Sequence, residues 1–288
     1  EELTDRTSPE TVRVFGTVCL VAILVVGGIV NAAVLTAPLE RNADYTDKYE
    51  TAYEPLDSTE FENGLLFIPT PYGDWQNHPF QSLRNDPGFD GPVVYALDRS
   101  PDSDFTVMDA YPNRTYYRYS YRGEWTPEPQ RHVTPKLEQL EVRSGETLTG
   151  ETTVGIPARV RGATVRLESV SGGHIQYDTN DLDENFTVDW TLSESDASLD
   201  GTNESVSVDD TDELVLLVRL VQPDGSTLTY RQETTVRTTD EEMEAVWPPE
   251  RSVCPLADYC GREGTYLPEN PESRFTAVSF ETRVTEAT

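Results

Sequence analysis

Apolar and polar positions come in alternating blocks between residues 64 and 130, and these blocks predict a small βαβαβ unit. Three apolar runs, at 65–68, 92–97 and 115–119, are rich in residues that favour strands. The segments between them contain the stretches 75–85 and 105–111, each long enough for a short helix. Strands that alternate with helical segments pair in parallel, so we expect a small α/β domain at 64–130.

From residue 135 onward the pattern changes to short strands separated by turns. SGG at 171–173 and PDG at 223–225 are the clearest turn sequences. About seven short strands in roughly a hundred residues favour an antiparallel β-sandwich, with Trp190 as a core residue. The seven expected strands lie at 137–142, 152–160, 163–170, 174–179, 186–192, 213–221 and 227–236.

The stretch 14–37 contains no charged residue and predicts a transmembrane helix. About 20 apolar residues are enough to span a bilayer core, whereas the apolar core of a signal peptide, the rival interpretation, is only about 7–15 residues long. The chain begins at Glu1 without an initiator Met. Removal of a leader and origin from a longer polypeptide explain this beginning equally well.

The sequence therefore predicts an α+β protein with one transmembrane helix, a small α/β unit and an antiparallel β-sandwich. Tyr45, Tyr49 and Tyr53, four residues apart in the connector at 38–63, are expected to pack this connector onto the next domain. The run 275–284 could form a last strand. The expected segments are a solvated loop at 1–13, the transmembrane helix at 14–37, a connector at 38–63, the α/β domain at 64–130, the sandwich at 135–240 and an irregular tail at 241–288.

The chain is strongly acidic, with 52 Asp and Glu against 22 Lys and Arg and a formal net charge of −30. Such a charge destabilises a compact chain through self-repulsion, which molar salt screens. Because the carboxylates are spread over the whole chain, we expect a protein of a salt-adapted organism such as a haloarchaeon. Recruitment of cations or basic partners is the alternative. Nucleic acid is excluded as a partner, since there is no basic stripe.

Cysteines and sequons point to an external C-terminal region. Cys254 and Cys260 are close enough in sequence to close a small disulfide loop, which fits an oxidising exterior. A free thiol pair and a metal site are the alternatives, although no nearby Cys or His completes four ligands. Three N-x-S/T sequons, at Asn113, Asn185 and Asn203, agree with an external location.

Two motifs in the α/β region carry a family resemblance: NDPGFDGPVVYALDR at 85–99 and YPNRTYY at 111–117. The region resembles the extracytoplasmic tail of multi-spanning glycosyltransferases that take sugars from polyprenyl-phosphate donors, the protein O-mannosyltransferase-like and aminoarabinose-transferase-like enzymes. Asn113 replaces the Asp of the family pattern, and Arg99-Ser100 replaces its Leu-Gly. The resemblance covers about 60 residues and leaves the β-sandwich unexplained.

The resemblance implies that this chain contains no catalytic residue. The family places its catalytic acid in an early external loop, which this chain does not include, and requires no cofactor here. The implied function is the external, non-catalytic part of a membrane glycosyltransferase that acts in surface glycan or lipid glycosylation. Its partners would be the lipid bilayer and, through the parent enzyme, the polyprenyl-phosphate sugar and its acceptor. The alternative is a stand-alone, single-span binding or envelope protein at the cell surface.

Three residues are candidates for binding. Asp98 and Arg99 follow the second predicted strand, at the end where open α/β sheets bind ligands. Arg114 could face the same edge and hold a phosphate or an acidic sugar with its guanidinium. In the purely structural interpretation, Asp98 caps the following helix and Arg114 forms an ion pair with it.

Overall fold

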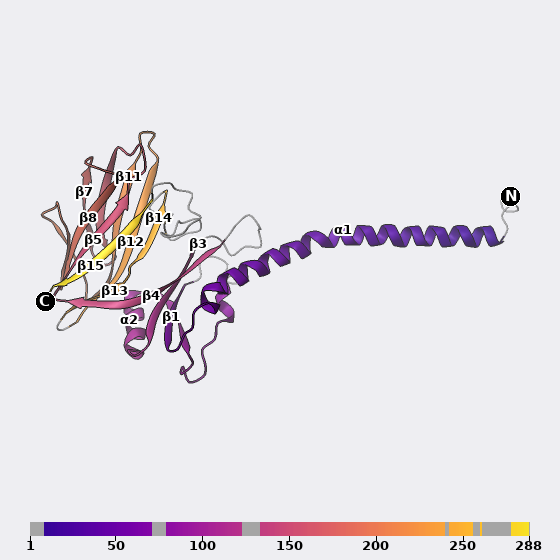
Figure 1. Cartoon of the computed structure of the whole chain (residues 1–288), viewed down its shortest axis with the longest axis horizontal. Helices are drawn as coiled ribbons and strands as arrows, with labels where there is room; N and C mark the ends of the chain where they lie inside the picture. Colours follow the sequence, from indigo (N-terminus) through magenta and orange to yellow (C-terminus); the bar gives the residue numbers. More distant parts are fainter. Residues whose placement is uncertain are drawn as a thin grey trace. The chain divides into compact units, whose positions relative to one another are not determined.

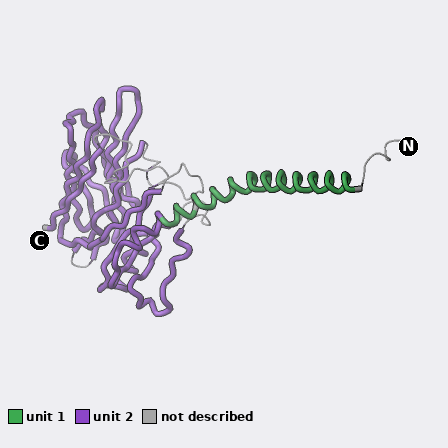
Figure 2. The backbone as a smooth tube through the Cα atoms, turned by 45° about the vertical axis from the view of Figure 1, so that its right-hand side comes forward, with its two compact units in different colours: residues 1–50, 126–130 green, residues 51–125, 131–288 purple. Residues whose placement is uncertain are grey.

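The computed structural model describes residues 9–70, 79–122, 133–239, 242–255, 260 and 278–287. The chain forms two compact units, residues 1–50 with 126–130 and residues 51–125 with 131–288 (Figure 2). The first unit consists mainly of helix α1, which begins at Pro9 and continues to Asp57 in the second unit (Figure 1). The predicted loop at 1–13 is described only from residue 9, where it is already helical.

Helix α1 contains the predicted membrane segment. Its large apolar side chains, among them Val14, Ile23 and Leu35, are exposed. By length and composition, α1 is the one described helix able to cross a membrane: the 24 residues of 14–37 rise about 36 Å, against about 30 Å for the hydrocarbon core. The predicted connector is largely helical, since α1 ends only at Asp57. Its Glu, Lys, Arg and Ala residues favour the helix.

The predicted parallel unit follows the end of α1 in the second compact unit. Strand β1 (Gly64–Pro69) pairs in parallel with β2 (Val93–Asp98) on one side and with β3 (Thr115–Arg122) on the other. The short 3₁₀ helix η2 (Pro79–Ser82) and helix α2 (Pro101–Ala110) lie in the two connections. The helical turn expected at 75–85 is described only from Pro79, because 71–78 lie outside the described residues.

The predicted sandwich is confirmed, with more strands than the sequence indicated. Its apolar core contains Trp190, which is 4% exposed, together with Leu148, Val165, Leu216 and Tyr230. These side chains lie between two sheets, as the alternation of buried and exposed positions requires. The strands are β4 (Thr134–Gly145), β5 (Thr147–Gly155), β6 (Gly162–Ser169), β7 (Gly173–Thr179), β8 (Asn185–Ser193), β9 (Asp196–Leu199), β10 (Ser205–Ser207), β11 (Thr211–Val221), β12 (Thr227–Thr238), β13 (Met243–Trp247), β14 (Glu250–Cys254) and β15 (Phe280–Ala287).

The parallel unit and the sandwich share one continuous sheet, where we expected two domains divided at 130–135. The ten-stranded sheet runs β2-β1-β3-β4-β13-β12-β11-β6-β7, with β14 beside β12, and the five-stranded sheet runs β10-β9-β8-β5-β15. The first half of β4 pairs with β3 and its second half pairs with β13. Figure 1 shows β4 leading from the parallel strands to the sandwich. A twelve-residue strand is long enough to pair with a different neighbour at each end.

The predicted irregular tail also contributes to both sheets. Strands β13 and β14 pair with β12, and β15 pairs with β5 along its whole length. The expected last strand at 275–284 is found at Phe280–Ala287, while residues 261–277 lie outside the described part. Prolines at 248, 249 and 255 flank the five residues of β14 on both sides, which leaves too short an apolar pattern to predict this strand.

Candidate functional site

Arg114 is a structural clamp at the start of the parallel strands. Its Nη1 donates to the carbonyls of Gly64 and Gly91, both at 3.0 Å, and its Nη2 donates to the carbonyl of Phe89 at 3.1 Å. The guanidinium also lies over the ring of Tyr111, 5.6 Å from its centroid. These contacts tie the loop of the first motif to the beginning of β1. All three of these hydrogen bonds from the guanidinium therefore go to backbone carbonyls.

The first motif closes the exposed edge of β2. The side chain of Asn85 donates to the Tyr95 carbonyl at 2.9 Å and accepts from the Tyr95 N–H at 2.7 Å. This amide pairs with the edge strand as a neighbouring strand would, which protects a sheet edge from pairing with another chain. Gly91 leaves room for the Asp86 carboxylate, which would have to shift if a Cβ were added at this position. The motif residues thus have clear structural roles.

Phe89 occupies the tip of this loop in a strained conformation. Its φ is 53°, in the left-handed region that bulky residues avoid. The backbone is held there, because the Phe89 N–H donates to the Asp86 carbonyl at 2.9 Å and the Phe89 carbonyl accepts from Arg114. The ring is 48% exposed. The loop therefore holds an aromatic side chain rigidly at the surface.

Asp98 and Arg99 lie at the opposite end of the sheet from Arg114. Asp98 ends β2, whereas Arg114 binds the carbonyl of Gly91, just before β2 begins. Six residues of strand separate these positions by about 20 Å. The prediction that Arg114 shares an edge or an ion pair with Asp98 is therefore wrong. The predicted cap is not found either, since Ser100 is the N-cap residue of α2 and makes no side-chain cap bond.

Asp98 instead lies beside a second carboxyl, Asp104 of α2. Asp104 is only 7% exposed and accepts a hydrogen bond of 3.3 Å from the backbone N–H of Arg99. Desolvation by burial, followed by the negative charge of Asp98, raises the pKa of Asp104 to about 7. The Arg99 hydrogen bond and the charge of Arg118 act in the opposite direction. Two adjacent carboxyls in such a place favour retention of one proton.

Further carboxylates surround this pair on neighbouring strands. Burial, and next the charge of Glu233, raises the pKa of Glu213 on β11 to about 7. The same two causes raise the pKa of Glu250 on β14 to about 7, and Asp98 contributes to both shifts. Arg118 is a buried cation that lines the same cavity as Asp98 and Asp104: it donates to the Pro248 carbonyl at 3.2 Å and lies 3.9 Å from Glu138. We call Asp98, Asp104, Glu213, Glu233 and Glu250 the seam carboxylates.

Two of the seam carboxylates, Asp98 and Asp104, line a small cavity. It measures about 20 Å³, which is room for a water molecule and too little for a sugar. In the part of the chain that the structure describes, no three His, Cys, Asp or Glu side chains converge to hold a metal ion. The arrangement can retain a proton, and it offers no space in which a substrate could meet an acid and a base. The cavity is lined by Phe67, Asp98, Asp104, Met108, Arg118, Leu140, Thr235 and Val246.

The remaining candidate residues are two cysteines and three sequon asparagines. Cys254 and Cys260 form a disulfide in the structure, the first of the three alternatives considered for this pair. The three sequon asparagines, Asn113, Asn185 and Asn203, are all exposed. Asn113 stands in the turn before Arg114, where its carbonyl accepts a bond of 2.7 Å from Asn63.

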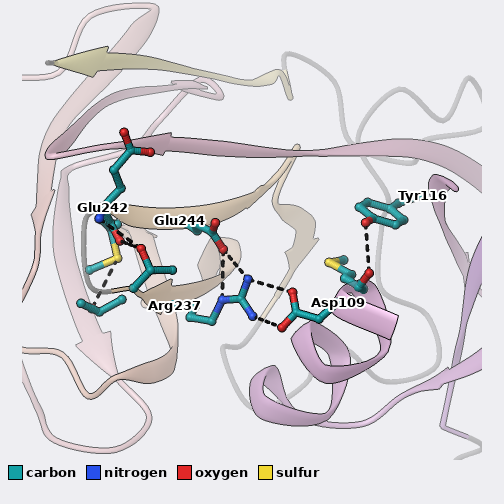
Figure 3. A network of polar contacts seen from close by, with 9 residues as sticks. Asp109, Tyr116, Arg237, Glu242 and Glu244 are labelled. Atoms are coloured by element: carbon teal, nitrogen blue, oxygen red, sulfur yellow. Dashed lines mark hydrogen bonds and ion pairs between the residues drawn. The ribbon is translucent and has the colours of Figure 1, made fainter. Parts of the chain in front are cut away.

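Arg237 on β12 links α2 to the large sheet and was not among the residues predicted from the sequence (Figure 3). Its guanidinium bonds to Asp109 on α2 and to Glu244 on β13, with Nη2 to Asp109 at 3.1 Å and Nε to Glu244 at 3.0 Å. It also lies 4.3 Å from the centroid of the Phe105 ring. Arg237 and Asp109 are 128 positions apart, so no local pattern could have revealed the pair.

Comparisons with known proteins place the chain in a family. The model of a domain of unknown function, DUF7846, matches residues 64–234, which is more than half of the chain. No curated protein and no solved structure matches. The matched region runs from β1 into β12 and crosses the boundary that we had expected at 130–135. The chain therefore belongs to the DUF7846 family.

Proposed function

We propose that this chain is the external, non-catalytic part of a membrane glycosyltransferase that uses polyprenyl-phosphate sugars in surface glycan or lipid glycosylation. One observation carries the proposal: Asn85 and Arg114, residues of the two motifs, use their side chains to bind backbone groups of the described chain. Asn85 pairs with the edge of β2, and Arg114 holds three carbonyls of the neighbouring loops. Such motifs mark a structural module, as expected for the tail of an enzyme whose catalytic loop lies elsewhere.

Helix α1, the disulfide and the sequons support an external location for the part of the chain that follows the membrane segment. A disulfide and exposed sequons both fit an oxidising compartment. The net charge of −30 supports adaptation to high salt, because molar salt reduces the Debye length to about 3 Å and screens repulsion between surface carboxylates. We therefore infer that the second compact unit works outside a salt-adapted cell.

The gene upstream of the codon for Glu1 tests the proposal directly. We expect it to encode several further membrane helices, with an acidic residue in the first external loop. A start codon a few residues upstream would contradict the proposal. It would favour the second candidate, a single-span surface protein, which α1 followed by a β-sandwich also fits.

A transfer assay tests the role of the tail within the enzyme. Membranes containing the enzyme with and without residues 64–288 are supplied with a polyprenyl-phosphate sugar and a set of acceptors. We expect the truncated enzyme to retain the chemical step and to lose rate or acceptor choice. An unchanged rate with an unchanged choice of acceptor would refute a functional role for the tail. The variant Arg114→Met serves as a control that loosens the loop without removing the domain.

A further inference from the structure

We propose that the Asp98–Asp104 pair is a proton-dependent latch that holds helix α2 against the ten-stranded sheet and releases it when the shared proton leaves. This inference goes beyond the proposed function, since it concerns a conformational device in the fold. It requires no ligand, and it applies whether or not the chain belongs to a glycosyltransferase.

The latch rests first on how α2 is attached. At its C-terminal end, Asp109 is bound by Arg237, and the Tyr116 hydroxyl donates to the Met108 carbonyl at 3.3 Å (Figure 3). Near its N-terminal end, the buried carboxyl of Asp104 lies beside Asp98. Phe105 and Met108 pack α2 into the core, with 2% and 4% exposure. The C-terminal end of the helix is also held by a cation and a hydroxyl, whereas the polar contact near its N-terminal end is a carboxyl next to another carboxyl.

The charges around Asp104 explain why a proton is needed there. Arg118 is buried and donates to the Pro248 carbonyl, and it lies 3.9 Å from Glu138, which is also paired with Lys136 and Arg251. Its charge lowers the pKa of Asp104, but burial and the charge of Asp98 outweigh it. When both aspartates are ionised, their repulsion acts in a desolvated site where water and salt screen it poorly. Among the described residues, the charged and titratable groups that face the pair, directly or through Asp98 and Glu138, are Arg118 on β3, Lys136 and Glu138 on β4, Glu213 on β11, Arg231 and Glu233 on β12, and Glu250 and Arg251 on β14.

The sign of the effect follows from proton linkage. The pKa of Asp104 is about 7 in the folded state, against 3.8 for a free aspartate. Its proton therefore stabilises the closed helix fully below about pH 4, and this contribution is lost as the pH rises towards 7. The latch is closed in acid and weakened at neutral and alkaline pH, which is opposite to the usual behaviour of a salt-bridged carboxylate.

Hydrogen exchange of the full chain in detergent micelles tests the latch. Protection factors of the α2 amides 105–108 are compared at pH 5 and pH 8 in 2 M KCl. Protection factors are needed because intrinsic exchange rates themselves rise with pH. We expect at least a tenfold loss of protection in α2 at pH 8, while amides of β11 and β12 keep theirs. High salt screens the repulsion between surface charges, so a pH effect that remains at 2 M KCl reports on the buried pair.

Two variants make the test specific. Asp104→Asn cannot ionise and can donate to Asp98, so its α2 protection should change less than twofold between pH 5 and pH 8. Asp102→Asn is the matched control, because Asp102 is an exposed acid on the same helix, and it should behave like the wild type. If Asp104→Asn does not fold, Asp98→Asn replaces it: Asp104 still titrates there because burial is the larger cause of its raised pKa, so the loss of α2 protection between pH 5 and pH 8 should be smaller than in the wild type. Equal α2 protection at both pH values in the wild type, or an equal loss in the aspartate variants, would overturn the latch.

Discussion

Replacement of Arg237 by Met should lower the free energy of unfolding by about 3 kcal/mol. Met retains much of the side-chain volume, so the change removes chiefly the charge and the hydrogen bonds. The Glu244 side chain is only 22% exposed, and losing its charged partner costs about 1–2 kcal/mol. The Asp109 side chain is 59% exposed and water can replace its partner, so that pair contributes less than about 1 kcal/mol. The guanidinium over Phe105 adds about 1 kcal/mol.

Unfolding of the full chain by urea in detergent micelles measures this loss. The fluorescence of Trp190 and Trp247, whose rings lie 6.4 Å apart in the sandwich, reports on the transition. Arg237→Lys is the control: it keeps the charge, loses the fork of donors and should cost about 1 kcal/mol. Double-mutant cycles with Glu244→Gln and Asp109→Asn then divide the energy between the two partners.

The structure predicts that coupling of Arg237 to Glu244 exceeds its coupling to Asp109. This order follows from the exposed fractions of the two carboxylates, since the better hydrated one loses less when its partner is removed. A larger coupling to Asp109, or a loss below about 0.5 kcal/mol for Arg237→Met, would refute the assignment of Arg237 as the link between α2 and the sheet.

Three further changes can be followed by the same unfolding measurement. Thr152→Val should cost about 1–3 kcal/mol, because the Thr152 hydroxyl accepts from Trp190 and donates to Gln232, both at 3.0 Å in the buried core; Thr152→Ser keeps the hydroxyl and should cost less. Phe89→Asn should stabilise the fold by about 0.5–1 kcal/mol, because Asn tolerates the left-handed backbone better than Phe, and a loss of stability would mean that the ring contributes packing. Arg114→Met should cost about 1–2 kcal/mol, because three carbonyls lose their donor, and an unchanged stability would contradict its role as a clamp.

The positions of Asp98 and Arg114 at the two ends of the parallel strands illustrate how far the motifs could be interpreted from sequence. The sequence correctly placed Asp98 after a strand and Arg114 before one. The predicted parallel pairing already carries these two residues to opposite ends of the sheet, so the expectation of a shared edge conflicted with the predicted topology. Arg114 is therefore paired with the loop before β2, and Asp98 with α2. Parallel pairing brings together residues at equal positions along neighbouring strands, and residues at opposite strand ends stay apart.

The sequence by itself determined the elements whose causes are local. The uncharged stretch 14–37 predicts an apolar helix, and α1 contains it. Alternating apolar positions indicated the strands that became β1–β8, β11 and β12, because one face of each strand must be buried. The fold class, a helix followed by α/β and sandwich strands, follows from these elements.

Only the tertiary structure decided which distant residues meet. It joined the parallel unit to the sandwich through β4. It also brought Arg237 to Asp109 across 128 positions, and gathered carboxylates from α2, β2, β11, β12 and β14 around one desolvated seam. The acidic charge is visible in the sequence, but the shift of each carboxyl pKa depends on burial and on neighbouring charges. Both are set by how the strands pair and how α2 packs in the folded chain.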